Sequence, residues 1–214
     1  MRTNASGSGD TPSRGLPTSG PAAARRRLRD LGLCHARGRG LTMGRVMSVL
    51  VAYGSKRGGT EGLACMVAEA LRQEGITAEV APARGVRRVE GYDAVVVGGS
   101  FYAFRWHRDA RRFVKHHARE LRRCPTYLFS SGPLDDSAVT RDIPPVKGVQ
   151  ALMDKIGARG HATFGGRLAP DAKGFPASAM AKKNAGDWRD SQHVRSWVQA
   201  ITTELRESGA RGAA

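Results

Sequence analysis

From residue 48 onward, apolar runs suited to buried strands alternate with segments that carry apolar side chains on one helical face. The run at 48–53 is continuous, as expected of a central parallel strand. Residues 60–74 then repeat apolar positions at helical spacing and end at Gly75, a typical left-handed helix cap. The same patterns predict further elements: strands at 76–80, 93–99, 126–130 and 161–168, and helices at 107–122, 149–156 and about 194–205.

Strands that alternate with helices predict one parallel sheet with helices on both faces, which is an α/β fold. Five strands in this rhythm favour a three-layer sandwich whose sheet has the order 2-1-3-4-5. The connection at 82–92 is too short for a complete crossover helix, so we expect it to be irregular. Asp187 and Asp190 are two candidate N-caps for the closing helix.

Residues 1–46 are rich in Gly, Ser, Pro and Arg and show no apolar periodicity, so we expect a disordered extension. The arginine-rich run at 25–29 has the charge of an export signal, but no apolar segment follows it. Because we expect the fold to begin at Ser48, Met43 and Met47 are candidate start residues. The predicted organisation is a folded domain at 47–208 followed by a disordered tail at 209–214.

The chain is strongly basic, with 35 Lys and Arg against 19 Asp and Glu and a formal net charge of +16. Nine of the basic and two of the acidic residues lie in 1–46, so the predicted domain is basic as well. Such a surface favours an acidic protein, an anionic lipid surface or nucleic acid as a partner. The sequence contains no helix-turn-helix, zinc-finger or aromatic RNA-binding pattern, which disfavours nucleic acid. Its three cysteines are scattered and form no CxxC motif, so we expect a reducing, cytoplasmic location and neither a disulfide scaffold nor a metal site.

The first strand leads directly into a loop of small, hydroxylated and basic residues, which ends at Thr60. A P-loop requires lysine where this chain has Thr60, and a dinucleotide fingerprint requires a second glycine two residues after Gly54, where Lys56 stands. A response regulator needs carboxylates at the ends of the first and third core strands, where this chain has Tyr53 and Ser130. These three classes of site are therefore disfavoured.

The remaining pattern, Ser-x-x-Gly-x-Thr, is typical of a cradle for a phosphomonoester. Hydroxyl groups, backbone N–H groups and a helix N-terminus would surround one anion there, and basic side chains would offset its charge. The alternative is a turn that merely joins strand to helix. The predicted phosphate-binding residues are Ser55, Lys56, Arg57, Gly58, Gly59 and Thr60.

Two more loops should reach the same edge of the sheet, because ligands of such folds bind at the carboxyl ends of the strands. The loop at 98–106 holds four of the thirteen aromatic residues and suits a flat, mostly apolar ring. The loop after the strand at 126–130 offers Gly132 for close backbone approach. For each loop the alternative is a structural role, in the core or in a turn. The predicted ring-binding residues are Ser100, Phe101, Tyr102, Ala103, Ser130, Ser131, Gly132, Pro133 and Leu134.

At these residues the chain resembles the flavodoxin-domain family, and within it most nearly the menaquinone-dependent protoporphyrinogen oxidase-like flavodoxins. The similarity is carried by five segments, at 49–60, 92–100, 113–117, 161–168 and 186–190. It implies a flavodoxin-like fold, non-covalent FMN and redox chemistry, with the phosphate and ring held by the residues named above. The chain departs from the family in its basic charge, and its stretch at 135–147 does not match the substrate loop of those oxidases residue by residue.

Three functions stay open at this point. The leading hypothesis is an FMN-dependent oxidoreductase that passes electrons to a quinone or a protein; the others are a non-enzymatic FMN electron carrier and a flavin-free flavodoxin-like scaffold. The oxidoreductase hypothesis needs no catalytic side chain, because the flavin supplies the redox chemistry. The expected partner is a redox protein or a membrane quinone.

The predicted helix at 107–122 bears a row of basic residues opposite its apolar face: Arg108, Arg111, Arg112, Lys115, Arg119, Arg122 and Arg123. The simplest interpretation is a solvated surface. The alternative is contact of this 108–123 face with anionic lipid, which would place the protein at the inner face of the membrane. His107, beside the aromatic loop, is a candidate proton donor or else a surface histidine.

Overall fold

A computed structural model describes residues 46–102, 105–172, 181 and 185–212. The chain divides into two compact units, Met1–Met43 and Gly44–Ala214, and all described residues belong to the second. Apart from Val46, the predicted disordered extension falls outside the described residues, and so do the start-residue alternative Met43 and Ala103 of the aromatic loop.

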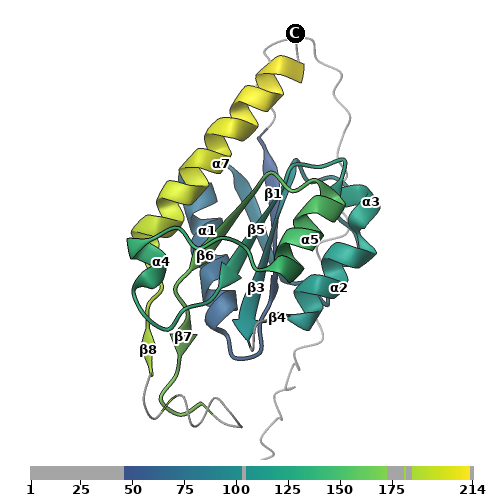
Figure 1. The fold of residues 1–214 in the computed structure, drawn as a ribbon. Helices are drawn as coiled ribbons and strands as arrows, with labels where there is room; N and C mark the ends of the chain where they lie inside the picture. The colour runs from purple at the N-terminus through teal and green to yellow at the C-terminus, as the bar shows by residue number, and fades with distance from the viewer. Residues whose placement is uncertain (1–45, 103–104, 173–180, 182–184, 213–214) are drawn as a thin grey trace, which may run out of the picture. The chain divides into compact units, whose positions relative to one another are not determined.

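The second unit is built on a parallel sheet, seen with its strands running down the picture in Figure 1. The five parallel strands lie in the order β2-β1-β3-β5-β6, which confirms the predicted order 2-1-3-4-5 once they are counted along the chain. A sixth, two-residue strand folds back antiparallel onto β3. The bounds are β1 (Ser48–Gly54), β2 (Thr77–Pro82), β3 (Ala94–Tyr102), β4 (Arg105–Trp106), β5 (Thr126–Ser131) and β6 (Gly160–Phe164).

Helices cover both faces of this sheet, which gives the predicted three layers (Figure 1). One face packs against α1 (Gly59–Gln73) and α7 (Ser191–Gly212), and its core includes Tyr127 and Phe129. The other face packs against α2 (Arg108–His116), α3 (Ala118–Leu121) and α5 (Lys147–Ile156). Because Leu128 belongs to the second core, β5 is buried on both sides, as its continuous apolar run predicts.

Gly75 ends α1 as predicted. Its φ is 79°, its N–H donates to the carbonyl of Arg72, and the N–H of Ile76 donates to the carbonyl of Leu71. These two bonds form a Schellman motif, which satisfies carbonyls that the helix end would leave without partners. The connection at 82–92 contains no helix, in agreement with its predicted irregularity.

The structure corrects two predicted elements. The single helix at 107–122 is divided at His117, which adopts φ −97° and ψ 21° while its ring packs 4.8 Å from that of Phe113. The single strand at 161–168 is divided at Gly165 and Gly166, where the chain leaves the sheet. Beyond them, β7 (Arg167–Leu168) pairs antiparallel with β8 (Gly186–Asp187) in a separate small sheet.

Asp190 caps α7, because its Oδ1 accepts the N–H of His193 at 2.6 Å. The other candidate, Asp187, lies in β8 and binds Arg189 instead. The helix runs to Gly212, beyond residue 208, where the sequence predicts the domain to end. Among the residues that the structure describes, none of the helices combines the length and apolar composition that crossing a membrane requires.

Candidate functional site

A pocket of about 830 Å³ lies at the carboxyl ends of β1, β3 and β5. The three predicted loops meet there, as expected for a parallel sheet at the point where the strand order reverses. The predicted residues that line it are Ser55, Lys56, Arg57, Gly59, Thr60, Ser100, Phe101, Ser130, Ser131, Gly132, Pro133 and Leu134. Gly58 is the N-cap of α1 and is not among the lining residues. The backbone of Tyr102 belongs to β3, but its side chain lies outside the described part of the structure, as does Ala103.

The loop between β1 and α1 is shaped by Gly58, whose φ of 79° favours glycine. The hydroxyl oxygen of Ser55 accepts the N–H of Gly58 at 3.0 Å, and this bond closes the loop on itself. No side chain caps α1. The helix itself supplies no acceptor for the N–H groups of its first turn, which therefore remain able to bind an anion.

Thr60 is the most informative residue of this loop. Its side chain is 1% exposed, and its Oγ1 has no hydrogen-bond partner in the described part of the chain. A buried hydroxyl without a partner is rare in native proteins and costs about 1–3 kcal/mol. Because Thr60 lines the pocket at the N-terminus of α1, an oxyanion bound there would satisfy it.

Arg167 is a cation at this site that sequence reasoning missed. A Cβ built on Gly59 would lie 3.3 Å from the backbone oxygen of Arg167, so β7 packs directly against the first residue of α1. Arg167 also lines the pocket, and its Nε lies 3.8 Å from Oδ2 of Asp187. The only signal in the sequence was the Gly165-Gly166 pair, which lets the strand turn toward α1.

The third loop is held in place by the chain that follows β6. The N–H of Gly132 donates to the carbonyl of Phe164 at 2.9 Å, and the N–H of Gly166 donates to the carbonyl of Pro133 at 2.7 Å. β5 ends at Ser131, one residue beyond the predicted strand at 126–130, so both Ser130 and Ser131 belong to the strand. Their hydroxyls leave opposite faces of the sheet, since side chains alternate along a strand.

Ser130 is paired with His161 of β6, whose Nε2 lies 2.9 Å from the serine Oγ. Burial lowers the pKa of His161 to about 4, and the negative charge of Asp142 offsets part of this effect. The imidazole is therefore neutral at pH 7. The pair forms part of the wall beneath the pocket, because Ser130 is one of its lining residues.

The aromatic loop divides into a core part and a pocket part. Trp106 is buried, and a Cβ on Gly99 would lie 2.5 Å from its indole ring, so this tryptophan packs over the end of β3. Gly98 makes room for Phe129 in the same way on the other face. The structural alternative is therefore correct for Trp106, whereas Phe101 lines the pocket.

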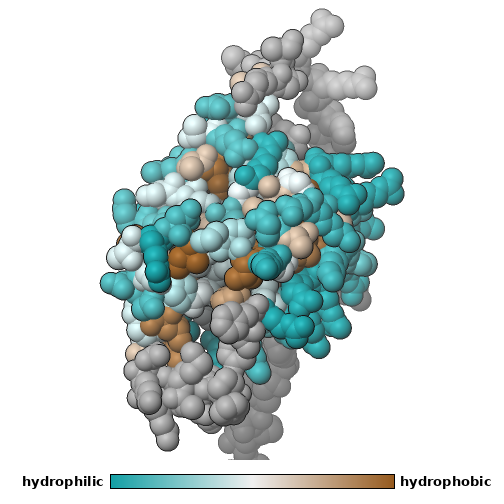
Figure 2. Space-filling view, viewed as in Figure 1, coloured by the Kyte–Doolittle hydropathy of each residue, from teal (hydrophilic) through white to brown (hydrophobic). Residues whose placement is uncertain are grey.

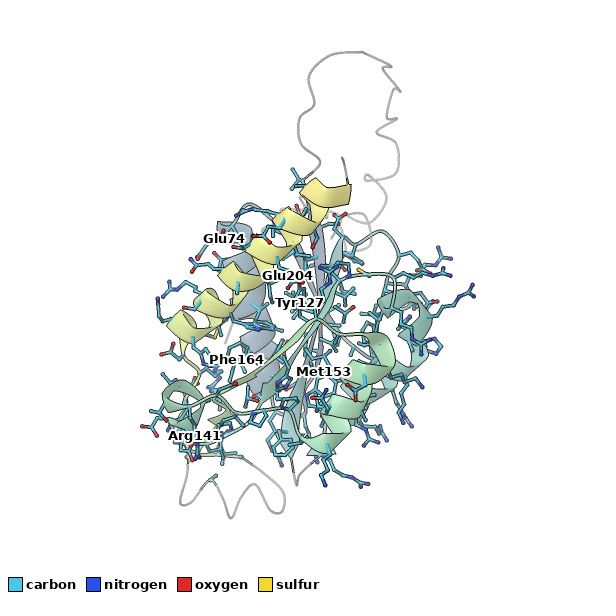
Figure 3. All side chains as sticks on the ribbon, turned by 45° about the horizontal axis from the view of Figure 1, so that its top comes forward. Glu74, Tyr127, Arg141, Met153, Phe164 and Glu204 are labelled. Atoms are coloured by element: carbon cyan, nitrogen blue, oxygen red, sulfur yellow. The ribbon has the colours of Figure 1, made fainter. Side chains whose placement is uncertain are left out.

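The connection between β5 and α5 forms a further wall that was not among the predicted site residues. It contains α4 (Ser137–Thr140) and is tied to β6, since Thr163 Oγ1 donates to the carbonyl of Ile143 at 3.0 Å. Figure 3 shows Arg141 in this region and Phe164 at the end of β6. The lining residues that this connection adds are Asp135, Ser137, Arg141, Ile143, Pro144 and Val146.

The pocket has a positive electrostatic character. Among the described residues, four cationic side chains line it, and the one lining carboxylate is Asp135, whose pKa is lowered by hydrogen bonds from Ser137. The cations are Lys56, Arg57, Arg141 and Arg167. His107 also lines the pocket, and burial lowers its pKa. It accepts the N–H of Asp109 at 3.3 Å as the N-cap of α2, which leaves it neutral in the resting site.

Residues 50–180 match the flavodoxin domain family. The chain belongs to this family. It is 33% identical over 86 residues to the quinone-dependent protoporphyrinogen IX dehydrogenase of Escherichia coli K12, and the same figures hold for the enzyme of strain O157:H7. The match covers 39% of this chain and spans about half, 48%, of the length of these curated relatives.

Solved flavodoxins are similar to this chain at much lower identity. A cysteine-to-serine variant of the Pseudomonas aeruginosa flavodoxin is 15% identical, with a TM-score of 0.49, and covers 75% of this chain and 99% of its own. The Streptococcus pneumonia TIGR4 flavodoxin is 14% identical, with the same TM-score, and covers 73% of this chain and 99% of its own. These likenesses concern the fold alone.

Family membership implies a flavin cofactor, and the residues of this flavodoxin-domain protein fit one. The buried Thr60 hydroxyl lacks a partner beside a helix N-terminus, which suits a phosphate group. The pocket lies within the usual range of volume for a small-molecule site, about 300–1,000 Å³. Its apolar side chains, such as Phe101 and Leu134, suit the ring system.

Proposed function

We propose that the pocket binds FMN non-covalently, with the phosphate at the N-terminus of α1. The observation that carries this proposal is the buried, unpartnered hydroxyl of Thr60 beside the first-turn N–H groups. Ser55 keeps a hydroxyl hydrogen to donate, since its oxygen already accepts from Gly58. Lys56, Arg57 and Arg167 would offset the charge of the phosphate.

The remaining lining residues would border the ring. Ser100 and Phe101 come from the end of β3, and Gly132 and Leu134 come from the loop that is bonded to the chain after β6. Hydrogen bonds with Phe164 of β6 and with Gly166, which follows that strand, fix the loop before any ligand arrives. Such preorganisation lowers the entropic cost of binding. Tyr102 and Ala103 remain predicted ring contacts.

We further propose that the protein is an FMN-dependent oxidoreductase of the protoporphyrinogen oxidase kind, with a quinone as acceptor. Bound FMN would supply one- and two-electron redox chemistry, and the polypeptide would bind, orient and desolvate the reactants. The support is the 33% identity to an E. coli protein named for protoporphyrinogen IX and quinone. The pocket extends beyond the phosphate loop as far as the wall formed by α4 and its flanking residues.

A non-enzymatic FMN electron carrier is the second candidate. It is favoured by the match of residues 50–180 to the flavodoxin domain family. It predicts electron exchange with a partner protein and no turnover of quinone in that partner's absence. Steady-state assays with a soluble quinone therefore separate the two candidates.

Equilibration of the full chain with FMN, followed by desalting and a visible absorption spectrum, tests the cofactor. We expect a perturbed flavin band that survives desalting. Riboflavin is the matched control, because it has the same ring and lacks the phosphate. If riboflavin is retained as firmly as FMN, the phosphate does not contribute to binding at this site. If neither flavin is retained, the flavin-free scaffold is the hypothesis that remains.

A further inference from the structure

A second concave surface has α2 as one of its walls. It is a groove of about 730 Å³ between the irregular connection after β2 and the helix α2. Its basic lining residues come from both segments, Arg84 and Arg87 from the connection and Arg112 and Lys115 from the helix. We call this surface the α2 groove.

The cations of the α2 groove differ from several arginines elsewhere in the described structure. Around α1 and α7, arginines pair with carboxylates: Arg72 with Glu69, Arg159 with Glu204 and Arg206 with Glu74. None of the four groove cations makes an ion pair or a hydrogen bond with a described residue. Figure 2 shows the hydrophilic character of the α2 side of the molecule, drawn in teal.

The groove contains one carboxylate, and that group has a partner outside the groove cations. Asp109 lies 3.7 Å from Nε of Arg108. The groove floor is apolar, formed in part by Ala83, Val86 and the buried Phe113. Unpaired positive charges thus stand on two walls over an apolar floor.

The α2 groove also adjoins the candidate flavin pocket. His107, which caps α2, lines the pocket, and Asp109, two residues further along the same helix, lines the groove. The groove and the pocket share no described lining residue, but both border the N-terminal part of α2. A partner bound along α2 would therefore contact a helix whose N-cap lines the pocket, which suits a redox partner.

We propose that the α2 groove binds an extended acidic segment of a protein redox partner. This inference rests on the proposed redox function for the identity of the partner, but not for the chemistry of the groove. Carboxylates of the segment would pair with the arginines, whose planar guanidinium groups bind carboxylates through two parallel hydrogen bonds. Small apolar side chains of the segment would contact the floor.

The shape of the groove favours a protein segment over the lipid surface that the sequence suggested for the 108–123 face. A flat bilayer contacts side chains that protrude from a surface more easily than side chains on the inner walls of a groove. Membrane-bound surfaces usually add apolar anchors, and the two large hydrophobic residues that are exposed in the described structure, Val46 (62%) and Val139 (54%), lie outside the groove. Nucleic acid is less favoured because the ring of Phe113 is only 3% exposed and offers little surface on which a base could stack.

Fluorescence anisotropy with a labelled oligo-glutamate peptide tests the proposal on the full chain. The double variant Arg84→Glu/Arg112→Glu reverses one charge on each wall of the groove. Its matched control, Arg119→Glu/Arg123→Glu, makes the same change in net charge at exposed residues outside the groove lining. All four residues are exposed, so we expect both variants to fold, and their melting temperatures verify this.

We expect the groove variant to weaken peptide binding at least about tenfold and the control variant less than about threefold, as local charge pairs predict. Binding by the wild type should also weaken with salt. Equal losses in the two variants would overturn the proposal, because net charge alone would then explain the binding. Tighter binding to phosphatidylglycerol vesicles or to DNA, lost in the same groove variant, would overturn it as well.

FMN retention is measured in the same samples. Loss of peptide binding with FMN retained isolates the groove from the pocket. A different result is that the wild type retains no FMN while the groove variant, and not the control variant, still weakens peptide binding. That result would contradict the proposed cofactor and support the proposed site for an acidic segment.

Discussion

The Oγ of Ser130 lies 2.9 Å from Nε2 of His161, and this contact joins the last residues of β5 to the edge strand β6 beneath the candidate flavin pocket. A second contact, from Thr163 Oγ1 to the carbonyl of Ile143, attaches the α4 connection to the same edge strand. Polar side chains of β6 thus organise two walls of the pocket, although neither His161 nor Thr163 was predicted as a site residue.

The Ser130–His161 contact predicts a pH dependence of stability. The imidazole titrates near pH 6.5 in an unfolded chain, whereas burial lowers its pKa to about 4 in the folded protein. Between these values the unfolded chain takes up a proton that the folded protein excludes. The free energy of unfolding is therefore not reduced by this group above about pH 6.5. It decreases by on the order of 3 kcal/mol as the pH drops toward 4.

The variant His161→Gln isolates this contribution, since an amide can keep a hydrogen bond to Ser130 without titrating. Urea unfolding at several pH values measures the free energy of unfolding of both proteins. We expect the wild type to lose more stability than the variant between pH 6.5 and 4. If the free energy of unfolding changes with pH in the same way in both proteins, His161 is protonated as easily in the folded protein as in the unfolded chain.

Thr60→Val replaces the buried hydroxyl by a methyl group of similar size. FMN affinity should fall about tenfold or more, because a hydrogen bond to a charged group contributes about 1.5–3 kcal/mol. Stability without flavin should stay equal or rise, since the hydroxyl has no partner in the described structure. Titration of FMN quenching and thermal melting measure the two quantities.

Thr202→Val is the matched control for this substitution. Thr202 is also fully buried, but its Oγ1 donates to the carbonyl of Val198 within α7, and it does not line the pocket. The control should bind FMN like the wild type. Equal FMN affinity in the Thr60 and Thr202 variants would exclude the Thr60 hydroxyl from the site.

The central fold could be predicted because β1, β3 and β5 contain continuous apolar runs and each long helix has a clear apolar face. The break at Gly165 could not, because the apolar pattern continues through Phe164 and Leu168. Its cause is tertiary: a Cβ on Gly165 would lie 2.0 Å from the backbone oxygen of Trp188, far along the chain.

The candidate site shows the same division. Its three loops follow from the rule that parallel strands end at one edge, so their residues could be named from the sequence. Arg167 reaches the phosphate loop only because β7 pairs with β8 and packs on Gly59. Arg141 reaches the pocket through an irregular connection, and such connections carry no periodicity from which their path can be predicted.

Gly165→Ala should therefore destabilise the protein strongly, by about 2–4 kcal/mol, because the obstacle is backbone and cannot rotate away. Gly209→Ala is the matched control. Gly209 lies in α7 with open space around it, so alanine should stabilise the helix by about 0.5–1 kcal/mol. Chemical unfolding compares the two variants. A tolerated alanine at position 165 would show that Trp188 does not pack there.

Arg167→Gln tests the cation that the fold brings to the phosphate loop. The side chain is exposed and only loosely paired with Asp187, so the substitution should leave the melting temperature nearly unchanged. FMN affinity should fall about three- to tenfold, because a nearby positive charge stabilises a phosphate dianion. Riboflavin, which lacks the phosphate, should bind the variant and the wild type equally.

The control Arg195→Gln removes an exposed arginine of α7 that lies outside the pocket lining and should bind FMN normally. Added salt should narrow the difference in FMN affinity between Arg167→Gln and the wild type, since ions screen an exposed charge. An equal loss of FMN and riboflavin affinity in Arg167→Gln would instead place Arg167 against the ring.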